Sequence, residues 1–340
     1  MLDDDLCLEN YNYDLPKHCI AYEPIKPKEK AKLLVFNRSL NKIIHTEFGA
    51  LCEFLPKCSI VFNDTKVIKA RIYAYKQSGA KCEFFIHKAL KDDEFLVQIK
   101  GRVRQNDILN LNDDLRIKIL ALNADGTRKI CFLKGQNSLN SSEVFALLDE
   151  IGHIPLPPYI KRADTKQDSK DYQSVFAKNL GAIAAPTASL HFSKDLLKEL
   201  SKAHKIYTLT LHIGAGTFKG VECENISQHK MHEEFYCLNE ELSTLINSDE
   251  ALLGVGTSVT RCIEHYARTH ILQGECSLFL HPLNKPIRQN YLLTNFHLPK
   301  STLIMLVASF IGRKKTLELY GEAIKKGYRF YSYGDAMLII

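Results

Sequence analysis

The stretch that decides the fold lies between residues 67 and 133 and consists of five short runs: VIKARIYAY (67–75), CEFFIHKA (82–89), EFLVQI (94–99), LRIKILA (115–121) and RKICFL (128–133). These runs are rich in β-branched and aromatic residues and tend to alternate apolar with polar positions, as half-buried strands do. Turn-forming dipeptides stand between runs: Ser78-Gly79, Asp92-Asp93 and Asp125-Gly126. Short strands separated by such turns predict a small β-barrel or β-sandwich.

The sequence on either side of this block predicts a different architecture. Residues 33–36 and 59–62 are typical of buried strands, 206–213 alternates as a strand does, and 252–255 is a further short strand. Patterns typical of helices occur at 143–150, after Ser193, after Asn239, at 259–267 and at 316–326. Strands that alternate with helices around an all-β block indicate an α/β fold with an inserted all-β domain. We therefore expect a discontinuous α/β catalytic domain at residues 1–65 and 151–340 and a small inserted β-barrel at 66–150.

The composition is that of a globular protein without a membrane segment. The chain has 340 residues, of which 45% are hydrophobic and 25% charged. Its apolar runs are too short to span a bilayer, and the acidic start MLDDDLCLEN does not resemble a signal peptide. We therefore expect a cytoplasmic protein with no membrane partner. The net charge of +6 is compatible with a polyanionic substrate such as RNA but does not establish one.

The cysteines and histidines do not predict a metal site. The ten cysteines are scattered, and none forms the Cys-x-x-Cys pair of zinc and iron–sulfur sites. His229 and His232 could share a helix face, but no second ligand pair follows them. We expect reduced, buried thiols and no bound metal.

The segment LLTNFHLPKS (292–301) combines an apolar strand with a polar turn. Pro299 fixes its own backbone angle and disfavours helix at the preceding residue, so the turn is stiff. The Ser-Thr pair at 301–302 can cap the apolar helix that follows. Because α/β proteins bind ligands at the carboxyl ends of their strands, Asn295 and His297 are candidate site residues.

The segment LHIGAGTF (211–218) also follows a predicted strand. It does not match the dinucleotide-binding fingerprint, because a lysine stands where the third glycine belongs and no helical pattern follows. Two interpretations remain: a close approach of the backbone to a ligand, or a plain bend. The first makes His212 a catalytic candidate, with substrate-binding candidates Gly214, Gly216 and Thr217.

The segment GVGTSVTR (254–261) leads from a predicted strand into a helix. Thr257 or Ser258 can cap this helix, and free amides at its start favour an anion or a ligand carboxylate. Arg261 lies about one turn further on. The spacing fits a ligand site containing Thr257 and Arg261, and it fits a plain strand-to-helix connection equally well.

Two further segments carry groups that can move protons or contact a base. His191 lies in a loop-rich stretch, and Asp335 follows Tyr333 in YSYGDAM (331–337). Each candidate histidine titrates near neutral pH and suits proton transfer, and a hydrogen-bonded structural role is the alternative. Asp335 could orient a base, bind an amine or form a turn, and Tyr333 could stack on a base or belong to the core.

Taken together, these motifs resemble one family, the S-adenosylmethionine:tRNA ribosyltransferase-isomerases of queuosine biosynthesis. Three longer blocks strengthen the resemblance: YDLPKHCIA (13–21), IVFNDTKVIKARI (60–72) and YRFYSYGDAMLI (328–339). It covers nearly the whole chain. The family's fold, an α/β domain with an inserted β-barrel, is similar to the fold that the patterns predict.

The resemblance implies a specific reaction. The family transfers the ribosyl part of S-adenosylmethionine to the aminomethyl group of a 7-deazaguanine at the tRNA wobble position. The ribose rearranges to an epoxycyclopentanediol, giving epoxyqueuosine, and adenine and methionine leave. This requires a base, a proton donor for adenine and a dry polar pocket, with S-adenosylmethionine as co-substrate and no other cofactor. The candidate catalytic groups are His191, His212, His297 and Asp335.

Two other classes of function remain open from the residues alone. An RNA-binding protein without catalysis would explain basic and aromatic surfaces, but not so many loops that join glycine or proline to histidine. A different S-adenosylmethionine-dependent enzyme, such as a methyltransferase, would release S-adenosylhomocysteine and no adenine. We expect the partners to be tRNA and S-adenosylmethionine, and the protein to be a monomer.

Overall fold

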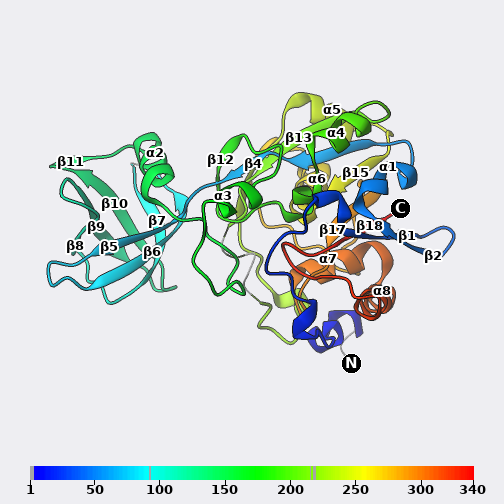
Figure 1. Ribbon diagram of the computed structural model, residues 1–340, viewed down its shortest axis with the longest axis horizontal. Coiled ribbons are helices and arrows are strands. Elements are labelled where there is room, and N and C mark those ends of the chain that lie inside the picture. Colours follow the sequence, from blue (N-terminus) through cyan, green and yellow to red (C-terminus); the bar gives the residue numbers. More distant parts are fainter. Residues whose placement is uncertain (1–3, 92, 215, 217–219) are drawn as a thin grey trace. The chain divides into compact units, whose positions relative to one another are not determined.

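The computed structural model describes residues 4–91, 93–214, 216 and 220–340, and the chain divides into two compact units (Figure 1). The larger unit consists of residues 1–65, 173–179 and 185–340, and the smaller unit of residues 66–172 and 180–184. The smaller unit begins at the expected residue 66 but continues beyond residue 150. The chain after 150 stays with it because the backbone of His153 bonds in both directions with that of Arg71.

Six of the described strands close the smaller unit into an antiparallel barrel. Their order is β10-β7-β6-β5-β8-β9, and β9 pairs back with β10. The elements are β5 (Arg71–Tyr75), β6 (Lys81–Ala89), β7 (Phe95–Lys100), β8 (Ile108–Asn110), β9 (Leu115–Leu122), β10 (Arg128–Lys134), β11 (Asn137–Ser138), α2 (Ser141–Ile151) and α3 (Asp168–Asp171). The predicted inserted barrel is confirmed, and its closure removes the sheet edges that an open sheet would expose.

Nine of the strands that the structure describes form one mixed sheet in the larger unit, in the order β16-β14-β13-β3-β15-β17-β18-β1-β2. Strands β13, β3, β15 and β17 are parallel, whereas β18 is antiparallel to β17 and parallel to β1. Their bounds are β1 (Lys32–Asn37), β2 (Lys42–Glu47), β3 (Ser59–Asn63), β13 (Ile206–Leu211), β14 (Glu234–Cys237), β15 (Leu252–Val255), β16 (Gln273–Cys276), β17 (Tyr291–Asn295) and β18 (Ala336–Ile339). The short strands β4 (Thr65–Val67) and β12 (Asn179–Ala182) stand at the unit boundaries.

Helices cover both faces of this sheet (Figure 1). On one face Leu34 and Leu292 pack with α7 (Thr302–Ile311) and α8 (Arg313–Lys325), and on the other Leu33 and Ile60 pack with α1 (Leu51–Phe54) and α4 (Lys194–Leu200). The remaining helices are α5 (Glu240–Ile246) and α6 (Thr257–Thr269). Strands buried on both sides are apolar through most of their length, which explains the unbroken apolar runs at 33–36 and 60–62.

Local capping signals place most of these helices correctly. Ser193, Asn239 and Ser301 each accept a hydrogen bond from the third residue of their helix. The expected cap at Thr257 or Ser258 is wrong, because Gly256 is the N-cap and Thr257 is already the first helical residue. Gly256 has φ +95°, a backbone angle that favours glycine there. Within the described part of the chain, no helix has the length and apolarity needed to cross a membrane.

Candidate functional site

Most of the candidate residues gather at one edge of the nine-stranded sheet. Parallel strands end at the same edge, so Asp64, His212, Gly256 and Asn295 follow or finish β3, β13, β15 and β17 at neighbouring positions. Because β18 runs antiparallel to β17, its preceding residue Asp335 stands at this edge as well. This is the part of an α/β sheet where ligands bind.

Asn295, the last residue of β17, links the short helix η6 (Thr187–His191) to the start of β18. Its Oδ1 accepts a hydrogen bond from Thr187 Oγ1 at 2.8 Å, and its Nδ2 lies 3.2 Å from His191 Nε2. The same Nδ2 lies 3.5 Å from the carbonyl oxygen of Asp335. The structure thus brings three predicted residues into one buried network.

The surroundings of His191 keep its ring neutral. The ring is buried and packs on Phe48, with 4.8 Å between the ring centroids. Burial, with help from Arg329 and Lys28, lowers the pKa of His191 to about 3. The ring can therefore accept a hydrogen bond at neutral pH, but it is far from the pKa that suits a proton carrier.

His297 is fastened into the turn before α7. Its ring Nε2 lies 2.9 Å from Thr294 Oγ1, and its backbone amide donates to the Tyr320 hydroxyl at 3.2 Å. The Tyr13 hydroxyl donates to its carbonyl oxygen. Burial lowers the pKa of His297 to about 3. This is the environment of a residue that fixes the turn.

Asp335 is buried and binds two backbone amides. Its Oδ1 accepts from Lys32 N at 3.0 Å at the start of β1, and its Oδ2 accepts from Arg329 N at 2.7 Å. Burial raises the pKa of Asp335, whereas the amides and the Arg329 guanidinium favour its charged form. The carboxylate therefore joins the segment before β18 to the first residue of β1.

His212 is the most accessible of the three candidate histidines. Its Nδ1 lies 2.8 Å from Thr65 Oγ1, and its ring stacks on Phe235 with centroids 5.7 Å apart. The side chain is only partly buried, whereas His191 and His297 are buried. Burial lowers the pKa of His212, and the nearby Asp64 opposes that shift. An imidazole with some access, next to a hydroxyl and a carboxylate, is the histidine here best suited to move a proton.

Arg261 lies within the protein, one turn into α6. It forms a buried ion pair with Glu234 of β14 and donates to the carbonyl oxygens of Cys276 at 2.9 Å and Leu278 at 3.1 Å. Burial opposes ionisation of Glu234, but the Arg261 guanidinium, His232 and the Gly214 amide together outweigh it and lower the pKa of Glu234 to about 2. Glu234 Oε1 also accepts from the Gly214 amide at 2.8 Å. Arg261 and Gly214 therefore belong to one network, which holds Gly214 shortly after the end of β13.

A cavity of about 320 Å³ lies beside this loop. Gly216, His232 and Thr302, the first residue of α7, line it together with Gly220, Glu222, Cys223, Gln228, His229 and Lys230. A Cβ on Gly216 would lie 2.5 Å from the His232 ring, so the ring fits only against glycine. The volume is at the lower end of that of small-molecule pockets. The cavity therefore supports the interpretation that the backbone of the glycine segment approaches a ligand closely.

The remaining candidates have different positions. Tyr333 is buried in the segment that leads to β18. Thr257 opens α6 with a partly exposed side chain. Thr217 lies outside the described residues, so its predicted role stays a prediction.

The sequence interpretation missed polar residues at the end of β3 and directly after it. Asn63 donates through Nδ2 to the Leu211 carbonyl at 2.9 Å, and Asp64 Oδ1 accepts from Thr210 Oγ1 at 2.6 Å. They tie the ends of β3 and β13 together below His212. The signal was present, since Asn63, Asp64 and Thr65 directly follow the apolar run at 60–62.

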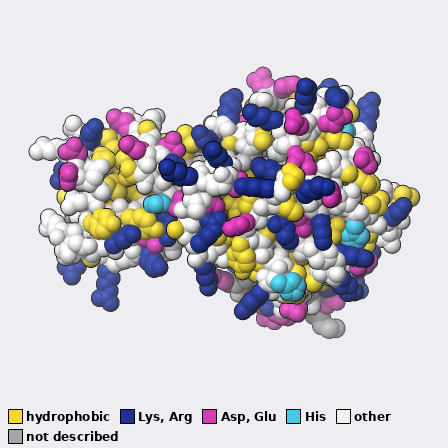
Figure 2. Space-filling model, in the orientation of Figure 1, with side chains coloured by type: hydrophobic (Ala, Val, Ile, Leu, Met, Phe, Trp, Pro, Cys, Tyr) yellow, Lys and Arg dark blue, Asp and Glu magenta, His cyan; other side chains and the backbone are white. Residues whose placement is uncertain are grey.

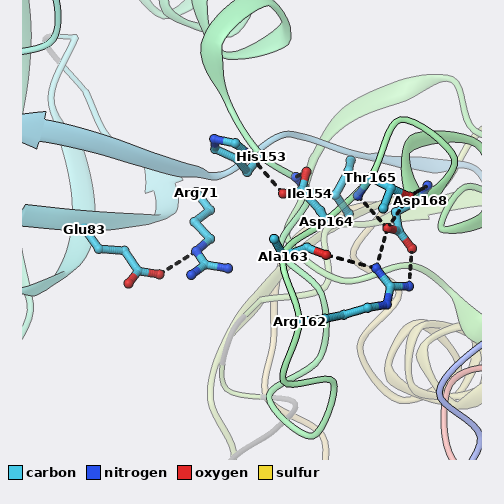
Figure 3. A network of polar contacts seen from close by, with 9 residues as sticks. All are labelled: Arg71, Glu83, His153, Ile154, Arg162, Ala163, Asp164, Thr165 and Asp168. Atoms are coloured by element: carbon cyan, nitrogen blue, oxygen red, sulfur yellow. Dashed lines mark hydrogen bonds and ion pairs between the residues drawn. The ribbon is translucent and has the colours of Figure 1, made fainter.

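A second polar network lies in the smaller unit (Figure 3). The Arg162 guanidinium donates hydrogen bonds to both carboxylate oxygens of Asp168, at 2.7 and 2.8 Å. His153 Nδ1 lies 2.8 Å from Asp164 Oδ1. These bonds hold the segment after α2. Among the residues that the structure describes, no group of three or more His, Cys, Asp or Glu side chains could hold a metal ion, and all ten cysteines are free.

The fold and this edge define the class of protein: an α/β enzyme scaffold with an inserted β-barrel and a polar site at the ends of its parallel strands. The chain belongs to the family described as queuosine biosynthesis protein, whose model matches residues 8–339. The predicted family and the expectation of an enzyme are therefore confirmed.

Close relatives have the same extent as this chain. A Campylobacter jejuni protein named S-adenosylmethionine:tRNA ribosyltransferase-isomerase is 60% identical over 342 residues, covering 100% of both chains. An Aliarcobacter butzleri protein of the same name is 53% identical over 338 residues, covering 99% of both. The crystal structure of a Thermotoga maritima S-adenosylmethionine tRNA ribosyltransferase matches with a TM-score of 0.54 and 29% identity, covering 97% of this chain and 100% of that one.

Proposed function

We propose that the protein transfers the ribosyl moiety of S-adenosylmethionine to the 7-aminomethyl-7-deazaguanine wobble base of tRNA and isomerises it. The products are epoxyqueuosine-tRNA, adenine and methionine. The observation that carries the proposal is the full-length match to relatives named for this class of reaction. The reaction is redox-neutral and so needs no redox cofactor. The proposal takes S-adenosylmethionine as co-substrate, no further cofactor, and a monomer in the cytoplasm.

The proposed chemistry begins at the ribose carbon next to the sulfonium, whose positive charge makes that carbon acidic. His212 removes the proton, the C4′–O4′ bond of the ribose breaks to give a vinyl sulfonium, and the freed oxyanion at C1′ becomes an aldehyde as adenine leaves with a proton. The amine of the base then adds to C4′ and loses a proton, and the sulfonium-stabilised carbanion formed at C5′ closes the carbocycle on the aldehyde, giving an alkoxide at C1′. Methionine then leaves as the epoxide closes. His212 is assigned the base because His191 and His297, with pKa values of about 3, are poor proton carriers at neutral pH.

The other candidates divide into contact and positioning roles. We assign substrate contact to Gly216, which lines the cavity, and to Thr257, which is partly exposed. Asn295 and Tyr333 are buried and reach a substrate only at the inner wall of the site. Arg261 and Gly214 act through Glu234, because their hydrogen bonds are directed into the protein. His191, His297 and Asp335 hold the edge of the sheet in shape, with His191 presenting a neutral ring to Asn295.

The test is incubation of the purified protein with S-adenosylmethionine and tRNA that carries the aminomethyl-deazaguanine. The expected products are free adenine, free methionine and a heavier wobble nucleoside, all seen by liquid chromatography and mass spectrometry. S-adenosylhomocysteine with methylated tRNA would indicate a methyltransferase, and tRNA binding without any product would indicate a binding protein. Either result would overturn the proposal.

A further inference from the structure

The outer face of β5 and β6 combines aromatic with basic side chains. Its residues alternate with the buried Ile72, Ala74 and Phe84, so they point away from the barrel core. This β5–β6 face consists of Arg71, Tyr73, Tyr75, Lys81, Glu83 and Phe85. In the view of Figure 2, hydrophobic side chains gather over β5 and β6, and Lys and Arg side chains border them.

The cations of this face lie against its rings. Lys81 Nζ is 3.7 Å from the centroid of the Tyr73 ring, and Arg71 Cζ is 5.5 Å from it. Arg71 and Glu83 reach toward each other from neighbouring strands, with Nε and Oε1 2.5 Å apart (Figure 3). The single carboxylate of the face is thus paired with Arg71, and the net charge of the face is positive.

The face is open to a partner and continues onto the next strand. Tyr75 is 43% exposed, although a tyrosine ring is largely apolar. On β7, Lys100 stands opposite Glu83 and Gln98 opposite Phe85, and both β7 side chains are exposed. Three strands therefore present rings and cations side by side.

The net charge of the chain is concentrated in the unit that carries this face. The smaller unit has 19 Lys and Arg against 14 Asp and Glu, which gives +5, whereas the larger unit has 26 against 25, which gives +1. A positive unit with exposed rings complements a polyanion that also has unstacked bases.

We propose that the β5–β6 face is a docking surface for the RNA substrate, with Tyr75 stacking on an unpaired base and Arg71, Lys81 and Lys100 contacting phosphates. The choice of tRNA as the RNA rests on the proposed function. Aromatic stacking suits the single-stranded bases of a tRNA loop, since paired bases have no free face to offer.

Steady-state kinetics with saturating S-adenosylmethionine test this surface. Loss of one stacking ring in Tyr75→Ala raises the KM for tRNA about ten-fold or more and leaves kcat within about two-fold. Tyr75→Phe, which keeps the ring, behaves as the parent protein, whereas Tyr75→Leu behaves as the alanine variant. Lys81→Ala with Lys100→Ala also raises KM and flattens its dependence on salt.

The matched control is Lys134→Ala, since Lys134 is exposed in the same unit but pairs with Leu115 and Asn137, away from the face. Its KM for tRNA stays that of the parent. An unchanged KM for tRNA in all face variants would overturn the inference. So would a dimer of the protein that Tyr75→Ala abolishes without changing the KM for tRNA, because the face would then be an interface between two copies of the chain. If the parent protein made no product, the proposed function would fail. The affinity of the same variants for the same tRNA, measured by fluorescence anisotropy, would still test whether the β5–β6 face binds RNA.

Discussion

His191, His212 and His297 lie at the same edge of the sheet but in different environments. Two are buried and hydrogen-bonded to Asn295 or Thr294, and one is partly accessible beside Thr65. Desolvation disfavours the imidazolium in proportion to burial, so access decides which ring can carry a proton. Sequence context cannot rank them, because all three adjoin similar loops.

His212→Ala should lower kcat by about 10²- to 10⁴-fold, the usual contribution of a general base, and leave the melting temperature nearly unchanged. His297→Ala should instead lower the melting temperature, because it removes a buried side chain from the turn. His204→Ala, before β13 and hydrogen-bonded to the Cys58 carbonyl, serves as the control with normal kcat. Normal turnover of the His212 variant at saturating substrates would refute its assignment.

Glu234→Gln should destabilise the protein by about 3–5 kcal/mol, because the buried Arg261 loses its counter-charge. Urea unfolding followed by circular dichroism measures this free energy. The control is Glu199→Gln, which removes the exposed pair with Lys202 and should cost less than about 1 kcal/mol. Equal stability of the two variants would mean that the buried pair is not structural.

The free energy of unfolding should fall as pH drops below about 6.5. The pKa values of His191 and His297 are about 3 in the folded protein and about 6.5 when unfolded, so the unfolded chain takes up protons first. Their contribution is complete above pH 6.5 and is lost progressively toward pH 3, by up to about 1.4 kcal/mol per pH unit for each ring. Urea unfolding at pH 7.5 and 5.5 measures the change in the free energy of unfolding. His297→Gln should make this change smaller. Identical free energies at the two pH values in the parent protein would contradict the conclusion that both rings are buried in their neutral form.

At the scale of elements, helix starts and strand interiors are largely local and therefore predictable. Ser193, Asn239 and Ser301 cap helices where the sequence suggests, because a side-chain oxygen needs only the next few amides. The start of α6 was misjudged, because the backbone angle at Gly256 makes that residue the N-cap.

The loop after β13 offers a test at this scale. Gly216→Ala should impair turnover, because its methyl group displaces the His232 ring that lines the cavity. A second change, His232→Ala, removes the clashing ring and should restore part of the loss in the double variant. Steady-state kinetics of the two single variants and the double variant measure the coupling, and strictly additive losses would contradict the contact.

At the scale of the whole molecule, the inserted barrel and the interrupted α/β domain follow from the change of periodicity near residue 66. The site follows only in outline. The segments expected to form the site do meet at one sheet edge. The ion pair of Arg261 with Glu234, however, joins residues 27 positions apart, and neither segment contains a local pattern that predicts it. For the same reason the sequence offers Arg261 as a ligand contact without showing its hydrogen bonds to the Leu278 and Cys276 carbonyl oxygens.

The most direct measurement follows the ribose of S-adenosylmethionine into tRNA. S-adenosylmethionine with carbon-13 in every ribose position is incubated with the protein and tRNA that carries the aminomethyl-deazaguanine, and the digested wobble nucleoside is weighed by mass spectrometry. The account predicts that all five labelled carbons appear in the nucleoside while unlabelled adenine and methionine are released in equal amounts. A wobble nucleoside without ribose label, or label retained in S-adenosylhomocysteine, would contradict it.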